Sequence, residues 1–210
     1  NGYAEGNKWT VPEVDARITS GWFWGKGKST PKSMEQLANM YFSSVGRNAP
    51  LLLNIPPNNK GTVDDAILNR VKEFGNAVKE TFTNNIAAGK NVSCTASEVR
   101  GNDIAYSPNN VLDGNQDTYW TTDDKTEATE ATLEVNLGET KQFDVVSIEE
   151  AIKFGQRISE FKVEYKNGSD EWKVFGSGKT VGAKRLCRRS PVKADKLRIT
   201  VKTSEKAEHK

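Results

Sequence analysis

The sequence predicts a protein of class α/β plus all-β, with an α/β part over residues 1–84 and an antiparallel β-sandwich over residues 85–210. In the first part, apolar residues recur at helical spacing around one unbroken apolar run. In the second part, short alternating runs are separated by turn signals. The 210 residues include 5 Trp, 5 Tyr and 8 Phe, which supply the bulk that folded cores need.

The first part contains an aromatic run at residues 21–24 (GWFW), followed by a loop rich in Gly, Lys and Ser. A helix is predicted over residues 33–42, because Ser33 is a good N-cap residue and apolar residues follow it at helical spacing. Residues 46–48 (GRN) end this helix.

The next segment, residues 51–55 (LLLNI), is a short apolar run closed by two prolines, typical of a strand buried on both faces in a parallel sheet. A second helix begins near Thr62 and carries one apolar stripe: Val63, Ile67, Leu68, Val71, Phe74, Val78 and Phe82. Because two parallel strands cannot form a stable sheet alone, we expect residues 1–84 to be the end of a larger α/β domain, a barrel.

The second part alternates polar and apolar residues in short runs, at residues 132–137, 161–165 and 197–201. Turn signals separate the runs, at residues 113–115, 167–169 and 176–178. Regular short strands with polar outer faces predict an antiparallel β-sandwich of about 100–120 residues. The cationic segment 184–189 (KRLCRR) is interpreted as the charged face of one strand.

Composition excludes several functions. With 30 Lys+Arg against 28 Asp+Glu, the net charge of +2 lacks the basic excess of a nucleic-acid binder. No apolar run approaches the roughly 18–20 residues that span a bilayer. The one histidine, His209, lies in a charged tail, so chemistry based on a histidine base or several histidine ligands is not expected. Cys94 and Cys187 are predicted to be buried free thiols. Because the chain starts with Asn1 and not Met, we expect a piece of a longer protein.

Residues 9–24 hold three tryptophans, a phenylalanine and the acids Glu13 and Asp15. Aromatic faces stack on the C–H faces of sugars and carboxylates accept hydrogen bonds from hydroxyl groups, so this mixture suits a carbohydrate pocket. The alternative is an apolar wedge under a loop with two surface acids. Two positions apart, Glu13 and Asp15 would share one face of a strand, which permits but does not require a carboxylate pair.

Residues 110–120 (NVLDGNQDTYW) combine oxygen-bearing side chains with a tight turn and a tryptophan. Carboxylates, backbone carbonyls and a Thr hydroxyl are ligands that Ca²⁺ prefers, which makes Asp113, Asn115 and Thr118 candidate metal ligands. The alternative is an Asp-Gly turn followed by a core tryptophan.

Taken together, these residues resemble glycoside hydrolase family 29, the retaining α-L-fucosidases. The resemblance rests on residues 9–23, 32–48, 51–61, 95–101, 111–120, 155–161 and 180–186, in consistent order along the chain. The segments LLLNIPP and GWF are similar to those of the subfamily that acts on α-1,3/1,4-linked fucose. The family fold implies a (β/α)8-like barrel, whose last strand–helix units are residues 1–84. A β-sandwich of the F5/8 type C (discoidin) kind then follows over residues 85–210.

The resemblance also implies which residues act. The catalytic Asp and Glu of the family would lie upstream of Asn1, so no catalytic residue is expected in this chain. Glu13, Asp15, Trp22 and Phe23 would bind substrate at the rim of the barrel. Discoidin-type sandwiches usually continue with a further strand after the equivalent of residues 197–201, so we expect an open sheet edge there and an incomplete calcium site.

Three hypotheses follow. The first is the C-terminal part of a bacterial, extracellular or cell-surface α-L-fucosidase. Its partners would be fucosylated glycans and the N-terminal barrel segment, not nucleic acid or a membrane. Its catalysis would require no cofactor, and a structural calcium ion is a candidate ligand. The second is a non-catalytic carbohydrate-binding module or support domain, with Tyr106 and Tyr119 on exposed loops and Trp120 and Trp172 in the core. The third is a fragment without function, whose apolar stripe over residues 63–82 would be exposed.

Overall fold

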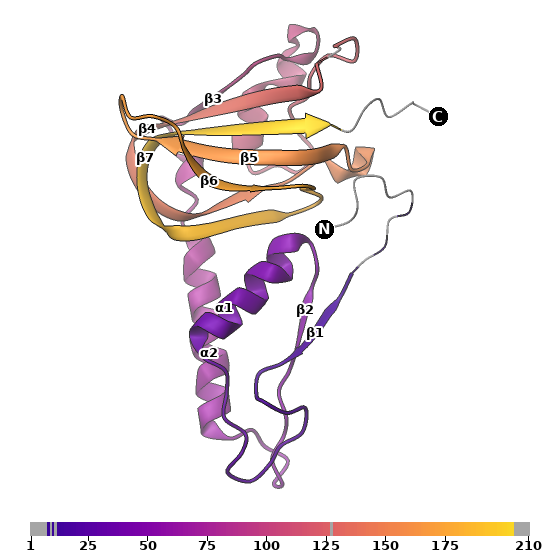
Figure 1. Ribbon diagram of the computed structural model, residues 1–210, viewed down its shortest axis with the longest axis vertical. Coiled ribbons are helices and arrows are strands. Elements are labelled where there is room, and N and C mark those ends of the chain that lie inside the picture. Colours follow the sequence, from indigo (N-terminus) through magenta and orange to yellow (C-terminus); the bar gives the residue numbers. More distant parts are fainter. Residues whose placement is uncertain (1–7, 9, 11, 127, 204–210) are drawn as a thin grey trace. The chain divides into compact units, whose positions relative to one another are not determined.

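The computed structural model describes residues 8, 10, 12–126 and 128–203. The chain divides into two compact units, and the boundary between Asn84 and Asn85 separates them. The first unit holds strands β1 and β2 and helices α1 and α2, and the second holds strands β3 to β7 (Figure 1).

The first unit contains a pair of parallel strands, as the sequence predicted. β1 (Val14–Arg17) pairs with β2 (Leu51–Asn54). The prediction that residues 51–55 are buried on both faces is wrong, because Leu52 is 55% exposed and Ile55 37%. A two-stranded sheet can be covered by its helices on one face only, and the other face remains open.

Two helices accompany these strands. α1 (Met34–Ser43) begins with the predicted cap: the Ser33 hydroxyl accepts from Gln36 N at 3.2 Å, and the Gln36 side chain accepts from Ser33 N at 2.9 Å. The 3₁₀ turn η1 (Val45–Arg47) follows, and Asn48 then adopts a left-handed conformation that ends the helical path. α2 (Asp65–Thr83) starts slightly later than predicted.

A small apolar cluster joins the helices to the strands. Ile18, Leu37 and Ile67 are fully buried at its centre. The predicted stripe of α2 contributes Val63, Val71 and Phe74 to the same cluster, whereas Leu68 and Phe82 are 39% and 43% exposed. The stripe is therefore covered in part by the helix and strands of its own unit.

The second unit is built on a five-stranded antiparallel sheet in the order β3-β4-β7-β5-β6, which confirms the predicted antiparallel β architecture. The strands are β3 (Ser93–Ala96), β4 (Glu130–Ile148), β5 (Ile158–Lys166), β6 (Lys173–Gly178) and β7 (Arg185–Thr203). Five short 3₁₀ turns accompany them: η2 (Ile86–Ala88), η3 (Arg100–Asn102), η4 (Ile104–Tyr106), η5 (Pro108–Leu112) and η6 (Ile152–Phe154).

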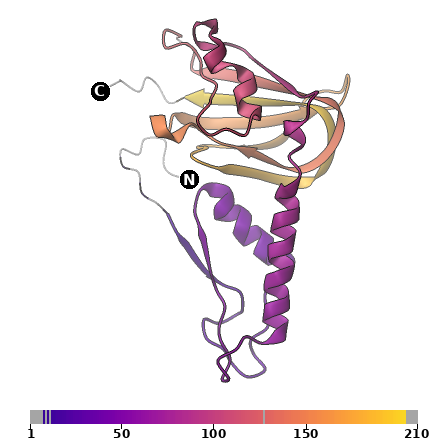
Figure 2. The ribbon, with the colours of Figure 1, turned by 180° about the vertical axis from the view of Figure 1, so that it is seen from behind.

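β4 and β7, of 19 residues each, are long enough to belong to two layers of this unit. One part of each strand lies in the five-stranded sheet, and the other part bends away from it and forms the second layer (Figures 1 and 2). The pairing of β4 with β7 shifts register after Asn136 and after Phe143. The layers meet in the core, where the Phe143 and Phe175 rings lie 5.5 Å apart. Gly138 permits the first bend: its φ is +78°, and a Cβ there would lie 2.7 Å from Asn91 O.

The core between the layers contains both cysteines. Phe161 and Val163 of β5 are buried with Leu133, Val135 and Leu137 of β4. Cys94 and Cys187 are buried free thiols, as predicted, and burial raises the pKa of the Cys94 thiol to about 12.

Three sequence predictions for this unit need correction. Residues 176–178, expected in a turn, belong to β6, because two glycines in a strand resemble a turn signal locally. The stretch from Leu197 to Val201 is not an edge, since it pairs with β4 on one side and β5 on the other. Trp172, expected in the core, is not part of the apolar core cluster of this unit. The Arg198 guanidinium lies 4.2 Å from its ring centroid. Trp120 does pack against the core, as expected.

The outer face of the sheet carries charges in cross-strand rows. Glu130, Lys202 and Glu160 form one row, and Glu134, Arg198 and Glu164 form another. Arg198 Nε lies 3.1 Å from Glu164 Oε2, and Lys162 Nζ lies 3.2 Å from Glu164 Oε1. Each of these carboxylates thus has a cation nearby, and Glu164 is buried beside its two cations, while the other carboxylates are more exposed.

Candidate substrate-binding hollow and loop cluster

The first unit contains an open hollow of about 460 Å³ at the carboxyl ends of its two strands. One side follows β1 and the other follows β2, so the parallel pairing brings the two segments together. The lining residues are Trp22, Phe23, Trp24, Asn54, Pro56, Pro57, Asn58 and Asn59. Aromatic rings and prolines with a few amide groups make a surface that suits the C–H face of a small polar ligand such as a sugar.

Local contacts hold the hollow together. Asn54 Nδ2 donates to Trp22 O at 2.8 Å, which ties the aromatic run to the end of β2. The Arg17 guanidinium lies 5.7 Å from the Trp22 ring centroid. Trp22 is 42% exposed and Phe23 is 88% exposed, so both predicted aromatic residues present ring surface to solvent.

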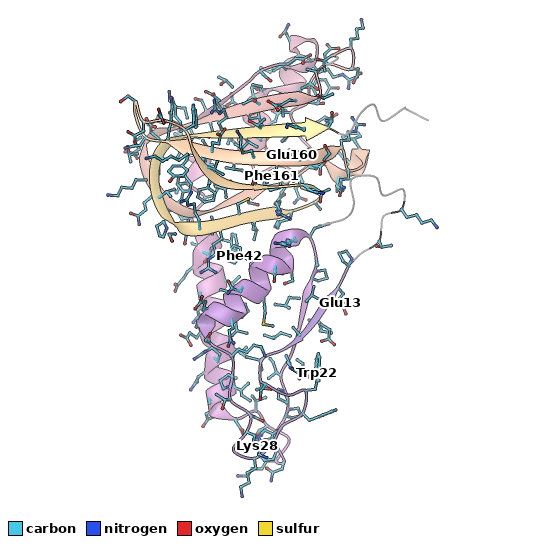
Figure 3. The ribbon with its side chains drawn as sticks, in the orientation of Figure 1. Glu13, Trp22, Lys28, Phe42, Glu160 and Phe161 are labelled. Carbon is cyan, nitrogen blue, oxygen red and sulfur yellow. The ribbon has the colours of Figure 1, made fainter. Side chains whose placement is uncertain are left out.

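The predicted acids lie elsewhere. Glu13 precedes β1 at its amino end, whereas Trp22 follows the carboxyl end of the strand (Figure 3). Glu13 and Asp15 are both exposed, and neither lines the hollow. Their role in substrate binding stays a prediction, and Trp9 lies outside the described residues. Sequence reasoning placed Trp24 in the candidate stretch 9–24 but not among the named substrate-binding residues, and it missed Asn58 as a lining residue.

In the second unit, the two predicted tyrosines do come together. The Tyr106 and Tyr119 ring centroids lie 5.5 Å apart, and Phe154 of η6 lies 5.0 Å from Tyr119. In Figure 2 the 3₁₀ turns between β3 and β4 lie on the near side of the strands. Because Phe154 comes from a different loop, no local pattern linked it to the tyrosines.

Cations cover part of this aromatic cluster. The Arg100 guanidinium lies 5.3 Å from the Tyr106 centroid, and Lys153 Nζ lies 5.8 Å from that of Tyr119. Burial, more than the nearby Tyr106, raises the pKa of the Tyr119 phenol. Phe154 remains 47% exposed. The cluster thus joins the connection between β3 and β4 to the connection between β4 and β5, and it still presents aromatic surface.

The predicted metal-binding residues share one turn. Thr118 Oγ1 donates to Asp113 Oδ2 at 2.6 Å and lies 3.0 Å from the Asn115 carbonyl oxygen. Asn115 N donates to Asp113 Oδ1 at 2.7 Å, and these hydrogen bonds, the hydroxyl first, lower the pKa of the Asp113 carboxyl. Among the described residues, no group of three or more His, Cys, Asp or Glu side chains is placed to hold a metal. His209 lies outside them.

Comparison with known proteins identifies the second unit. The family model of the F5/8 type C domain matches residues 93–209, more than half of the chain. The chain belongs to the F5/8 type C domain family. Its five-stranded antiparallel sheet and the loop cluster around Tyr119 lie within this domain.

The F5/8 type C domain and the unit before it are together similar to α-L-fucosidases. Alpha-L-fucosidase 1 of Arabidopsis thaliana is 38% identical over 185 residues, which are 87% of this chain and 36% of that protein. A Ruminococcus gnavus family 29 fucosidase, solved in complex with fucose, is 56% identical with a TM-score of 0.89, covering 97% of this chain and 40% of that one.

A third similar protein, SpGH29, is 36% identical with a TM-score of 0.86, and covers 97% of this chain and 43% of its own. The resemblance to family 29 fucosidases is therefore confirmed, although the chain spans well under half the length of these relatives. The helices in the described part of the chain include none that is long and apolar enough to cross a membrane.

Proposed function

We propose that this chain is the C-terminal part of a retaining α-L-fucosidase that hydrolyses terminal α-1,3/1,4-linked L-fucose from glycans. The similarity over 97% of the chain to a fucosidase solved with fucose carries this proposal. In it, residues 1–84 are the last strand–helix units of a TIM barrel. The hollow at the carboxyl ends of β1 and β2 agrees with this, because barrel enzymes place their active sites at that face.

The open face of the first unit supports a larger domain. Val14, Leu52 and Ile55 are 36%, 55% and 37% exposed. Parallel strands are normally covered on both faces, so further strands and helices of a barrel would bury these side chains. The N-terminal barrel segment is thus the proposed partner of this surface.

In the proposed enzyme, the aromatic rim binds the sugar and the reacting groups lie upstream of Asn1. A retaining mechanism needs two carboxyl groups about 5–5.5 Å apart, one as nucleophile and one as acid and base. Trp22 and Phe23 would pack against the C–H face and methyl group of fucose. Glu13 and Asp15 do not line the hollow, so any contact that they make with a glycan would lie outside it.

The test is the turnover of an aryl α-L-fucoside. The 210-residue chain alone should show none, whereas the same chain joined to its upstream barrel segment should be active. In the joined protein, Phe23→Ala should raise KM about three- to tenfold because an exposed ring that packs on the sugar is lost, while Phe82→Ala on α2 should not. Turnover by the isolated 210 residues would contradict the placement of the catalytic pair.

A second candidate function, a carbohydrate-binding module, is favoured by the approach of Tyr106, Tyr119 and Phe154 in loops. Such a module would tether the enzyme to fucosylated glycans. Calorimetric titration of the chain with fucosylated oligosaccharides should show binding that Phe154→Ala weakens, while Val174→Ala on β6 leaves it unchanged. Absence of heat with every glycan would favour a support domain instead.

We also propose a structural calcium ion at the turn of residues 113–118. The Asp113 carboxylate, the Asn115 carbonyl and the Thr118 hydroxyl are hard oxygen donors that converge within hydrogen-bonding distance of each other. The positive charge of a bound ion would hold these three oxygen atoms together and so stabilise the turn. Thermal unfolding should shift upward in millimolar CaCl₂ relative to EGTA, and Asp113→Ala should abolish the shift. An equal melting temperature in both buffers would count against the ion.

The proposed enzyme acts outside the cell or at the bacterial cell surface, where fucosylated glycans are accessible. Neither nucleic acid nor a membrane is among its proposed partners. Fractionation of the source cells, with activity measured in medium, surface and cytosolic fractions, tests this location.

A further inference from the structure

Asp64 stands at the N-cap of α2 but does not cap the helix. Its backbone is extended, as N-cap geometry requires, and its carbonyl accepts from Ile67 N at 2.9 Å and Leu68 N at 3.0 Å. Aspartate at this position ordinarily turns its side chain back to an N–H group of the first turn. Ser33 does so at the start of α1, whereas the Asp64 side chain makes no such bond.

The Asp64 carboxylate points instead to the wall of the hollow. Oδ2 accepts from Trp24 Nε1 at 2.7 Å, across 40 positions of the sequence, and Oδ1 accepts from Asn58 Nδ2 at 2.9 Å. These two hydrogen bonds, that from Asn58 first, lower the pKa of the Asp64 carboxyl. Each carboxylate oxygen therefore already has a donor.

The Asn58 amide is fixed from its other side. Its Oδ1 accepts from Lys60 N at 2.9 Å, from Thr62 N at 3.2 Å and from Thr62 Oγ1 at 3.1 Å. With the oxygen held by the loop, the Nδ2 group faces Asp64. A series of hydrogen bonds thus runs from the loop through Asn58 and Asp64 to the indole N–H of Trp24.

Trp24 and Asn58 line the hollow, whereas Asp64 lies behind them. We propose that Asp64 is a positioning residue that holds the Trp24 ring as a further sugar-contacting wall of the hollow. This inference rests on the proposed fucosidase function. Trp24 would contact the apolar C–H face of the glycan, and Asp64 would act only through Trp24 because its own side chain does not line the hollow. A charged hydrogen bond to an indole N–H fixes a ring that would otherwise turn in an open hollow.

The inference predicts a change in binding without a change in the chemical step. In the active protein formed with the upstream barrel segment, Asp64→Asn should raise KM for a fucosylated oligosaccharide about three- to tenfold and leave kcat within about twofold. The amide replaces one carboxylate oxygen by an NH₂ group, which would face the N–H donor of Trp24 or of Asn58 and weaken the hold on the indole. Trp24→Phe, which removes the indole N–H, should act in the same direction.

The matched control is Asp65→Asn, one position further on, at an exposed site in the first turn of α2. It removes the same charge and should leave KM unchanged. If Asp64→Asn and Asp65→Asn have equal KM values, or if Asp64→Asn lowers kcat at constant KM, the positioning role is overturned.

A second measurement separates this inference from the proposed function. In ¹H–¹⁵N spectra of the 210-residue chain, the Trp24 indole N–H should exchange slowly with water and become faster in Asp64→Asn but not in Asp65→Asn. Unchanged exchange in Asp64→Asn would overturn the inference. If the joined wild-type protein turns over no fucoside, the proposed function fails, and the indole exchange alone then decides whether Asp64 holds Trp24.

Discussion

Glu150 closes the loop that carries η6, and its replacement gives the sharpest test of the second unit. Its Oε1 accepts from Arg157 N at 2.8 Å and from Ile158 N at 2.9 Å, and its Oε2 accepts from Gly182 N at 2.6 Å. The Glu150→Gln variant keeps an oxygen for one side only. Its NH₂ group would then face the Gly182 N–H, which leaves that donor without an acceptor.

The expected loss follows from these contacts. A hydrogen bond to a charged group contributes about 1.5–3 kcal/mol, and a buried donor left unpaired costs about 1–3 kcal/mol. Because the loop is partly exposed, water replaces some of the loss, and we expect the free energy of unfolding to fall by about 2 kcal/mol. For a domain of this size, a loss of about 2 kcal/mol lowers Tm by roughly 6–12 °C.

The assay is thermal unfolding followed by circular dichroism, with Glu149→Gln as the matched control. Glu149 is the neighbouring residue, and its carboxylate makes a surface ion pair with Lys184 at 3.5 Å. Such a pair contributes about 0–1 kcal/mol, so the control should unfold close to the wild type. Equal Tm values for the two variants would refute the proposed role of Glu150 in closing the loop. Unchanged amide hydrogen exchange at Gly182 in Glu150→Gln would refute it as well.

Four further predictions concern packing, helix propensity, reactivity and pH. Gly178→Ala should destabilise the domain by about 1–3 kcal/mol in urea unfolding, because a Cβ there would lie 2.8 Å from the ring of buried Phe161. Gly75→Ala, where a Cβ on α2 meets nothing within 4 Å, should instead stabilise by about 0.5–1 kcal/mol; a loss of stability at position 75 would show that the space is not free. Cys94, with a pKa of about 12, should resist a disulfide reagent at pH 8 until urea unfolds the chain, and rapid labelling of the folded protein would contradict its burial. Backbone N–H groups, that of residue 125 first, lower the pKa of the Asp123 carboxyl below its ordinary 3.8. The stability that the Asp123 carboxylate contributes is therefore complete above its ordinary pKa of 3.8 and is lost as pH falls through the lower native pKa. The difference in unfolding free energy between wild type and Asp123→Asn should then vanish in acid. A constant difference between about pH 6 and pH 2 would exclude this linkage.

The local features of both units could be predicted from the sequence. The Ser33 cap, the helices and the parallel strand after residue 50 follow from spacing and capping chemistry within a few neighbouring residues. The antiparallel strands follow from alternation of period two. The resemblance to family 29 implied that Trp22 and Phe23 bind substrate; both line the hollow, and their role in binding stays a prediction.

Only the tertiary structure decided what depends on residues far apart in the sequence. The bond from Trp24 to Asp64 spans 40 positions and the bond from Gly182 to Glu150 spans 32, so no local pattern contains them. The same holds for Leu52, whose apolar run predicted burial although its unit covers only one face. Period and propensity determine which elements form, because they act between neighbours. The partners of each carboxylate, and the exposure of each strand face, depend on which elements the folded chain brings together.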